Sequence, residues 1–334
     1  MIPSRLTDRY GRVASDLRVS LTDRCNLRCT YCMPPEGLPW LPTPDVLTDE
    51  EVNRLVTIAV TRLGVTEIRF TGGEPLLRPG LAGIVAHAAA LDPRPSLSLT
   101  TNGIGLDRHA ALLREAGLDR VNVSLDTLSP ERFVQLTHRK RHADVLAGLA
   151  AAVRAGLGPV KTNSVLVRGV NEDEAVPLLR FALDHGYQQR FIEQMPLDAG
   201  HTWSRSRMVT ADEILAALEA EFTLLPDPDE RGGAPAETWL VADHPGAPRV
   251  GVIASVTRPF CHDCDRTRLT ADGQIRNCLF ARDESDLRAL LREGGSDEQI
   301  VARWQGAMWA KLPGHGIDDP TFLQPVRPMS AIGG

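Results

Sequence analysis

Residues 25–32 read Cys25-Asn26-Leu27-Arg28-Cys29-Thr30-Tyr31-Cys32, which is a Cx3Cx2C motif. A four-iron cluster normally takes four cysteine sulfurs, and this motif supplies three of them. The fourth iron would therefore stay open to a ligand that is not a protein side chain. Because an open coordination site is where a metal centre does chemistry, the motif indicates an iron–sulfur enzyme rather than a cluster that only supports a fold.

Two other interpretations of these three cysteines are weaker. A structural zinc site would need four ligands, in paired CxxC units or with histidine, and no histidine lies between Ile2 and Cys32. A disulfide framework is not expected in a chain of 334 residues with six cysteines and no secretory signal. The cluster interpretation gains support from a second motif downstream, Thr71-Gly72-Gly73-Glu74-Pro75.

The Cx3Cx2C motif with an aromatic residue, Tyr31, before its last cysteine, followed by the Gly-Gly-Glu-Pro motif, resembles the radical S-adenosylmethionine (SAM) superfamily. The resemblance implies that the open iron chelates the amino and carboxylate groups of SAM. It further implies that the reduced cluster cleaves SAM to a 5′-deoxyadenosyl radical.

The composition is that of an ordinary globular protein, with 43% hydrophobic and 24% charged residues. The amino-terminal residues are not apolar, and no stretch approaches the roughly eighteen apolar residues of a membrane span. Secretion and membrane insertion are therefore disfavoured, and a cytoplasmic location is expected. The net charge of −6 argues against nonspecific binding of nucleic acid.

An alternation of strands and helices runs through the first two thirds of the chain. The strands are expected at 17–22, 65–70, 97–100, 120–125, 160–167 and 189–193. The helices between them are expected near 48–62, where Thr48-Asp49-Glu50-Glu51 is a capping box, and near 81–90, 108–116, 143–155 and 174–185. A further helix is expected near 211–221, after the last of these strands. Repeated β–α units predict a parallel sheet with helices outside, and six units suit a partial, open TIM-like barrel.

Active sites of such folds lie at the carboxyl ends of the strands. The cysteine loop and the Gly-Gly-Glu-Pro motif both follow an expected strand, as do the stretches 100–103, 124–126 and 193–196. Residues 226–233 are rich in Pro, Gly and Asp and suggest a linker. We therefore expect a barrel domain at 1–230 and a carboxy-terminal region at 231–334, with short strands at 237–241 and 249–256.

A second cysteine group, Cys261-His262-Asp263-Cys264 followed by Cys278 after thirteen intervening residues, lies in the carboxy-terminal region. Three thiolates again favour a four-iron cluster with one open iron, while the alternative is a structural zinc completed by a histidine such as His262. Arg266 and Arg268 follow directly, and guanidinium groups beside an open cluster suggest a phosphorylated substrate. In a chain with only three lysines among 37 basic residues, a single arginine is weak evidence for such a site.

Nearly the whole chain resembles one family within the superfamily, the GTP 3′,8-cyclases of molybdenum cofactor biosynthesis. The matching stretches are residues 16–26, 31–34, 68–75, 100–103, 121–126, 190–193, 260–269, 277–280 and the terminal Ile332-Gly333-Gly334. The resemblance implies a lyase with two [4Fe-4S] clusters, the first on Cys25, Cys29 and Cys32 and the second on Cys261, Cys264 and Cys278. It implies an α/β fold of the radical SAM type with a carboxy-terminal extension that carries the second cluster.

The reaction implied by the resemblance begins when the 5′-deoxyadenosyl radical removes the 3′ hydrogen of GTP. The 3′ carbon radical then attacks C8 of guanine, and uptake of one electron and one proton gives (8S)-3′,8-cyclo-7,8-dihydroguanosine 5′-triphosphate. The SAM-binding residues implied are Tyr31, Gly72, Gly73, Glu74, Thr100, Ser124 and Met195. The GTP-binding residues implied are Arg18, Arg69, Lys161, Arg190, Arg266 and Arg268, and the second cluster would hold the guanine.

The residues themselves support part of this assignment. Lys161 is one of only three lysines in an arginine-rich chain, which indicates that this position specifically requires a lysine. Arg18, Arg69 and Arg190, like Lys161, fall in expected strands, and buried arginines without an anion would be unfavourable. Glu67 stands where relatives often have a lysine, so the triphosphate contacts are rearranged or Glu67 pairs with another arginine. By resemblance, the catalytic residues include Gly333 and Gly334 of the tail, with Arg327 nearby.

The resemblance also implies partners: an electron donor such as flavodoxin or ferredoxin, and a cyclic pyranopterin monophosphate synthase that receives the product. A homodimer is the oligomeric state to test. Two alternatives are another radical SAM enzyme with an auxiliary cluster that acts on a peptide, and a non-catalytic iron–sulfur electron carrier. Peptide-modifying enzymes of this kind usually carry more cysteines near the carboxyl terminus than the three found here. An electron carrier would need clusters in which every iron has a protein ligand, and two groups of three cysteines do not provide this.

Overall fold

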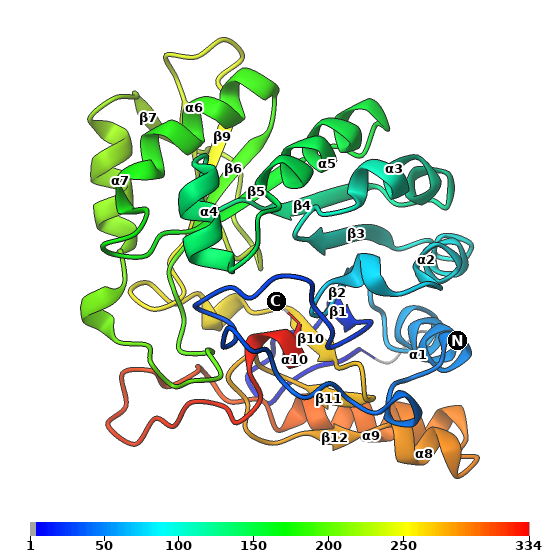
Figure 1. The fold of residues 1–334 in the computed structure, drawn as a ribbon. Helices are drawn as coiled ribbons and strands as arrows, with labels where there is room; N and C mark the ends of the chain where they lie inside the picture. Colours follow the sequence, from blue (N-terminus) through cyan, green and yellow to red (C-terminus); the bar gives the residue numbers. More distant parts are fainter. Residues whose placement is uncertain (1–4, 334) are drawn as a thin grey trace.

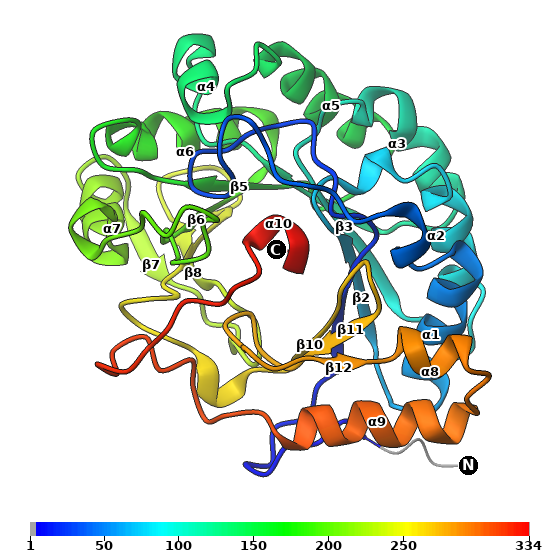
Figure 2. The same ribbon diagram turned by 60° about the horizontal axis from the view of Figure 1, so that its bottom comes forward.

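The computed structural model describes residues 5–333, which form a twelve-stranded sheet curved around a central space (Figures 1 and 2). The strand order is linear, β12-β11-β10-β1-β2-β3-β4-β5-β6-β9-β8-β7. Helices lie along the outer side of the curve, so the expected α/β architecture is confirmed. None of the helices within residues 5–333 is both long enough and apolar enough to cross a membrane.

The six expected parallel strands are all present. They are β1 (Asp16–Ser20), β2 (Glu67–Thr71), β3 (Ser96–Thr101), β4 (Arg120–Ser124), β5 (Lys161–Val165) and β6 (Gln188–Ile192). The expected helices are confirmed as α1 (Asp49–Thr61), α2 (Leu81–Ala89), α3 (Leu106–Glu115), α5 (His142–Arg154), α6 (Ala175–His185) and α7 (Ala211–Glu219), and α4 (Pro130–Thr137) is an additional helix. The capping box of α1 is present, with the Thr48 side chain accepting from the N–H of Glu51.

Strict alternation gives the curved sheet an apolar outer face and a polar inner face. In β1, Leu17 and Val19 belong to the main hydrophobic core under the helices, while Arg18 lines the central cavity. In β2, Phe70 packs in the same core and Arg69 faces the cavity. The inner face of these strands therefore presents arginine side chains to the central cavity.

The carboxy-terminal region adds a strand to each end of the parallel array. The strands expected at 237–241 and 249–256 are confirmed as β8 (Glu237–Val241) and β9 (Arg249–Ile253), whereas the sequence predicted neither the strand β10 (Arg266–Leu269) nor the pairing of β9 and β10 with the parallel strands. β9 pairs parallel with β6, and β10 pairs parallel with β1. The remaining strands, β7 (Leu224–Pro226), β8, β11 (Gln274–Arg276) and β12 (Ser285–Asp286), extend the two edges with antiparallel pairs. Residues 227–236, within and around the linker candidate, connect the β7–β8 hairpin, and the boundary at residue 230 stays a prediction.

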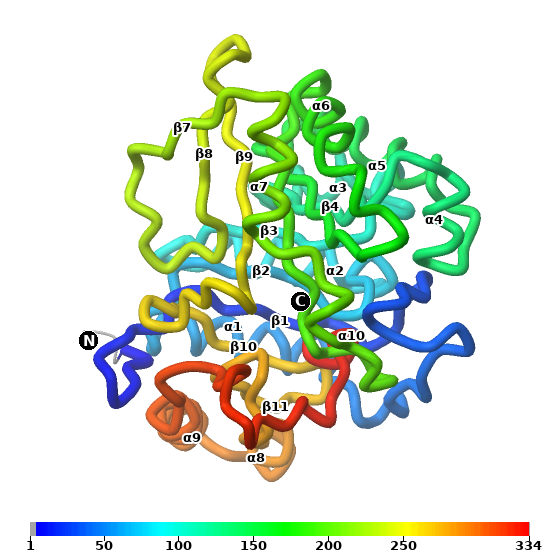
Figure 3. Tube along the Cα trace, turned by 90° about the vertical axis from the view of Figure 1, so that its left-hand side faces the viewer, coloured from blue at the N-terminus to red at the C-terminus, as the bar shows by residue number. Residues whose placement is uncertain are grey.

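The last part of the chain returns to the inner side of the curved sheet. Helices α8 (Arg288–Arg292) and α9 (Asp297–Trp309) lie beside β10 and β11 (Figure 3). Trp304 of α9 is fully buried, and its ring N–H donates to Thr267 Oγ1 of β10 at 3.0 Å. The short helix α10 (Met329–Ile332) then lies on the inner side of the curved sheet (Figure 2). The carboxy-terminal tail around α10 therefore lies next to the polar inner face of the sheet.

Candidate active site

A cavity of about 280 Å³ lies at the carboxyl ends of the parallel strands. It brings together most of the residues that the sequence singled out, although they are spread over more than 240 positions. Those that line it are Cys25, Cys29, Cys32, Tyr31, Gly72, Gly73, Thr100, Ser124, Met195, Arg18, Arg69, Arg190, Arg266 and Arg268. Of the other predicted residues that the structure describes, Glu74, Lys161, Arg327 and Gly333 do not line it, and Cys261, Cys264 and Cys278 line a second, adjoining cavity instead.

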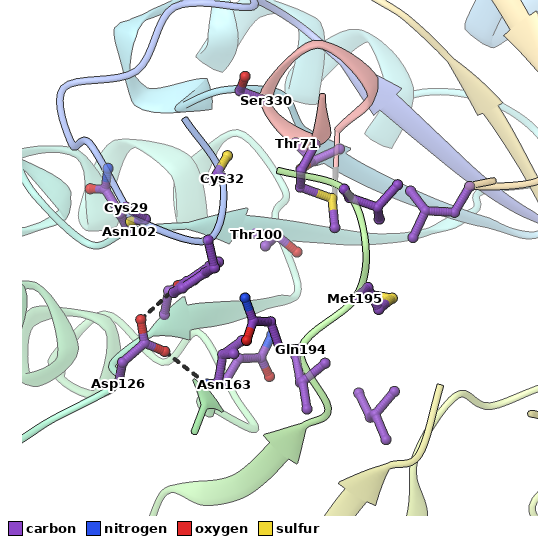
Figure 4. A pocket seen from close by; sticks show the side chains of 18 of the residues that line it. Cys29, Cys32, Thr71, Thr100, Asn102, Asp126, Asn163, Gln194, Met195 and Ser330 are labelled. Carbon is purple, nitrogen blue, oxygen red and sulfur yellow. Dashed lines mark hydrogen bonds between the residues drawn. The ribbon is translucent and has the colours of Figure 1, made fainter. Parts of the chain in front are cut away.

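The cysteine loop is tied to the ends of β4 and β5 through Asp126. The Tyr31 hydroxyl donates to Asp126 Oδ2 at 2.6 Å, and Oδ1 accepts from the Val165 N–H at 2.8 Å (Figure 4). Burial raises the pKa of Asp126 to about 6. Asn102, at the end of β3, donates to Asn26 Oδ1 at 2.7 Å. These contacts position the loop against three strand ends.

The three thiols of this loop share one wall of the cavity. Burial, and then the charge of Cys25, raise the pKa of Cys32 to about 12, and burial also raises the pKa of Cys25 to about 11. Three thiolates here become stable only beside a cationic centre, and thiolate is the ligand that iron–sulfur clusters take, so the donor set fits such a cluster. Within residues 5–333, no three His, Cys, Asp or Glu side chains converge tightly enough to hold a single metal ion.

The two glycines of the Gly-Gly-Glu-Pro motif line the cavity, whereas the glutamate side chain is bonded to neighbouring residues of the fold. A Cβ on Gly73 would lie 2.4 Å from the carbonyl oxygen of Arg24, so glycine is required for this close approach to the cysteine loop. The fully buried Glu74 carboxylate accepts from Thr101 Oγ1 and from the Asn102 N–H, each at 2.7 Å. Glu74 therefore holds the end of β3 in place.

Register aligns three arginines side by side across the inner face. Arg69 of β2 lies opposite Arg18 of β1, which lies opposite Arg268 of β10. The Nε atoms of Arg18 and Arg69 are buried without a hydrogen-bond partner among the described residues. Arg190 of β6 lines the cavity as well, and it donates to the amide oxygens of Asn163 and Asn122 rather than to a carboxylate.

The positive charge on this face exceeds the negative charge that accompanies it. Asp16 lies 3.7 Å from the Arg18 guanidinium. Burial, and then the charge of Arg18, lower the pKa of Arg69 to about 10. Burial, and then Arg190, lower the pKa of Lys161 to about 7, and Lys161 shares the inner face of β5 with Asn163. Crowded cations of this kind are stabilised by a polyanionic ligand.

Glu67 forms an ion pair at 2.9 Å with Arg120 of β4. The pair lies on the inner strand face two residues before Arg69. The expectation that Glu67 pairs with another arginine is therefore confirmed, and its partner Arg120 is not one of the arginines that line the cavity.

The second cysteine group lines an adjoining cavity of about 80 Å³. The two cavities share six lining residues, among them Phe260, Arg266 and Arg268. Although burial opposes it, the charges of Arg266 and Lys311 lower the pKa of Cys264 to about 7, which favours the thiolate that a metal needs.

The histidines near the second group are not placed to complete a zinc site. The His262 side chain is 76% exposed and pairs with Asp263. His315 lines the second cavity, but its Nε2 donates to the Ser255 carbonyl at 3.0 Å and its Nδ1 accepts from the Ile317 N–H at 3.1 Å. Both nitrogens of His315 are therefore already used, which disfavours the zinc alternative.

The carboxy-terminal tail contacts both parts of the site. Met329 and Ser330 line the main cavity, and the carbonyl oxygen of Gly333 accepts from Arg268 at 2.6 Å. Arg327 forms ion pairs of 2.7 Å with both Asp272 and Glu284, which fix the tail to the β10–β11 turn and the loop before β12. Gly334, predicted as catalytic, lies outside the described residues.

Several residues of the site were not among the sequence predictions. Asp126 closed a stretch already noted at a strand end, so its position was a usable signal. Asn163 follows Lys161 at the strand period of two, which would have placed it on the same face. Met329 and Ser330 gave no signal, because only the return of the chain brings them to the cavity.

Comparisons with known proteins agree with this geometry. Residues 19–182 match the radical SAM superfamily, and residues 187–317 match a family described as Molybdenum Cofactor Synthesis C. A crystal structure of Streptococcus suis SuiB bound to S-adenosylmethionine superposes with a TM-score of 0.58 at 12% identity, covering 84% of this chain and 65% of that one. This likeness confirms the radical SAM fold.

Curated relatives are far more similar in sequence. A GTP 3′,8-cyclase of Streptomyces coelicolor is 67% identical over 98% of this chain and 96% of its own length. A GTP 3′,8-cyclase of Mycolicibacterium smegmatis is 62% identical over 98% of this chain and 92% of its own. The cavity with its three thiols, the row of arginines and these relatives lead to one conclusion: the chain belongs to the GTP 3′,8-cyclase family of radical SAM enzymes.

Proposed function

We propose that this cavity converts GTP to (8S)-3′,8-cyclo-7,8-dihydroguanosine 5′-triphosphate, the first step of molybdenum cofactor biosynthesis. The observation that carries the proposal is the row of Arg69, Arg18 and Arg268 in the same cavity as three cysteine thiols. This arrangement suits a polyanionic substrate beside a radical-generating centre, and the curated relatives are named for the same reaction.

The end of the cavity near the cysteine loop is the SAM site in this proposal. Cys25, Cys29 and Cys32 would hold a [4Fe-4S] cluster, which when bound supplies the electron that cleaves SAM to a 5′-deoxyadenosyl radical. The side chain of Tyr31 and the backbone of the Gly-Gly-Glu-Pro motif would position the cofactor. The proposed SAM contacts are Tyr31, Gly72, Gly73, Glu74, Thr100, Ser124 and Met195.

The opposite end of the cavity is the GTP site in this proposal. Guanidinium groups bind phosphate oxygens in a bidentate manner, and several of them are needed to offset the charge of a triphosphate. Holding the triphosphate at one end and the base at the other fixes the ribose so that C3′ approaches C8. The proposed GTP contacts are Arg18, Arg69, Lys161, Arg190, Arg266 and Arg268.

The second cysteine group would hold a second [4Fe-4S] cluster on Cys261, Cys264 and Cys278, next to the guanine. The tail would complete the site: Gly333 contacts Arg268, and Gly334 continues from it. Because Arg327 is engaged with Asp272 and Glu284, we assign it a role in positioning the tail rather than in touching substrate. Flavodoxin or ferredoxin as electron donor, a cyclic pyranopterin monophosphate synthase as acceptor of the product, and a homodimer belong to the same proposal.

Product analysis tests the proposed reaction directly. We expect anaerobically reconstituted protein with SAM, reductant and 3′-deuterated GTP to yield a product isomeric with GTP. The deuterium should appear in 5′-deoxyadenosine, because the 3′ hydrogen is the atom removed. Mass spectrometry of both products checks this. Deuterium-free 5′-deoxyadenosine with unchanged GTP would exclude GTP as the substrate.

Replacing Gly73 with alanine tests the SAM end of the cavity. The added Cβ would lie 2.4 Å from the carbonyl oxygen of Arg24 and 2.5 Å from that of Asp23, so the loop must move. We expect a loss of about 1–3 kcal/mol in unfolding free energy and a weakened affinity for SAM. Gly83→Ala in α2 is the matched control, because nothing lies within 4 Å of its Cβ. Urea denaturation and SAM titration measure the two effects; equal results for both variants would argue against the tight approach.

A further inference from the structure

Lys311 is a buried lysine directly beside the second cysteine group. Its residue is 2% exposed, and it follows the end of α9. The ammonium Nζ donates to the carbonyl oxygen of Cys264 at 3.0 Å, to Cys264 Sγ at 3.2 Å and to the carbonyl oxygen of Arg266 at 3.1 Å. All three N–H donors are therefore used, and one of them reaches a thiol proposed as a cluster ligand.

The choice of lysine at this position is itself informative. Three acceptors that converge on one nitrogen suit the tetrahedral ammonium group, whereas the planar fork of arginine cannot serve them from a single atom. Elsewhere this chain strongly prefers arginine, because only three of its 37 basic residues are lysines. The geometry at Cys264 thus explains why a lysine stands here.

We propose that Lys311 is a positioning residue for the second cluster and raises its reduction potential. Hydrogen bonds to cluster sulfurs and nearby positive charge both stabilise the reduced, more negative state. Lys311 supplies both effects to Cys264, and its bond to the Arg266 carbonyl also holds the turn at 264–266 against the cavity. This inference rests on the second cluster of the proposed function.

If Lys311 had a purely structural role, its replacement would leave the reduction potential of the second cluster unchanged. If Lys311 only joined the end of α9 to β10, a neutral side chain able to donate to the two carbonyl oxygens would replace it. Lys311→Gln provides such donors without the charge. The potential of the cluster therefore separates the two roles, whereas protein stability alone does not.

The experiment uses the full chain with Cys25, Cys29 and Cys32 replaced by alanine, so that the second cysteine group alone binds a cluster. In this background, Lys311→Gln and Lys311→Met are compared with Lys140→Met, a matched change at an exposed lysine. Iron content, thermal melting and a redox titration followed by electron paramagnetic resonance are measured on each protein.

We expect both Lys311 variants to keep a cluster of about four irons with a more negative midpoint potential and an altered resonance signal, and Lys140→Met to match the background. If Lys311→Met does not fold, Lys311→Gln decides. An unchanged potential in a Lys311 variant with full iron overturns the role of Lys311 alone. A background protein that holds zinc or no metal overturns the second cluster as well, while deuterium transfer from GTP tests the reaction separately.

Discussion

Alanine at Cys261, Cys264 and Cys278 is expected to lower the iron content from about eight to about four per chain and to abolish conversion of GTP. The three thiols line a cavity that shares Arg266 and Arg268 with the main cavity, so their removal disrupts the proposed guanine end of the site. Production of 5′-deoxyadenosine from SAM should persist, because the first cysteine group is untouched. Iron and acid-labile sulfide analysis, with chromatography of both products, measures these effects.

The matched control is alanine at Cys25, Cys29 and Cys32. This variant should also keep about four irons but should lose SAM cleavage altogether, since the SAM-binding iron is gone. The two variants therefore fail at different steps. A parent protein with about four irons and one zinc would instead make the second group a structural zinc site, and the placement of guanine there would be wrong.

Replacing Arg69 with methionine is expected to change stability and binding in opposite directions. Its Nε is buried without a hydrogen-bond partner among the described residues, and its neighbour in register is another arginine, Arg18. Removing this cation should raise the unfolding free energy of the metal-free protein by about 1–2 kcal/mol. Affinity for GTP should fall about 10- to 100-fold, because a charge-assisted contact to phosphate is lost.

Arg94→Met is the matched control for this change. Arg94 is an exposed arginine paired with Asp119 at 2.8 Å, so its loss should cost at most about 1 kcal/mol of stability and leave GTP binding unchanged. Urea denaturation and calorimetric titration with GTP in the absence of SAM measure both quantities. If Arg69→Met destabilises the protein and binds GTP normally, then Arg69 supports the sheet and does not bind the substrate.

Much of the fold was predictable because its signals are local. Alternating apolar residues mark the strands, capping residues such as Thr48 mark helix starts, and glycines such as Gly186, with a positive φ of 70°, mark helix ends. The motifs at strand ends were predictable for the same reason. The strands β9 and β10 were harder, because pairing with β6 and β1 depends on contacts between distant parts of the chain.

The sequence by itself determined the chemistry: two groups of three cysteines, the glycine-rich motif and arginines at the strand period, all of which are fixed by spacing along the chain. Only the tertiary structure decided how these parts meet. Register between β10, β1 and β2 aligns Arg268, Arg18 and Arg69, and the return of the chain after α9 brings Lys311 to Cys264. Such contacts arise from packing between segments far apart in sequence, for which no local pattern exists.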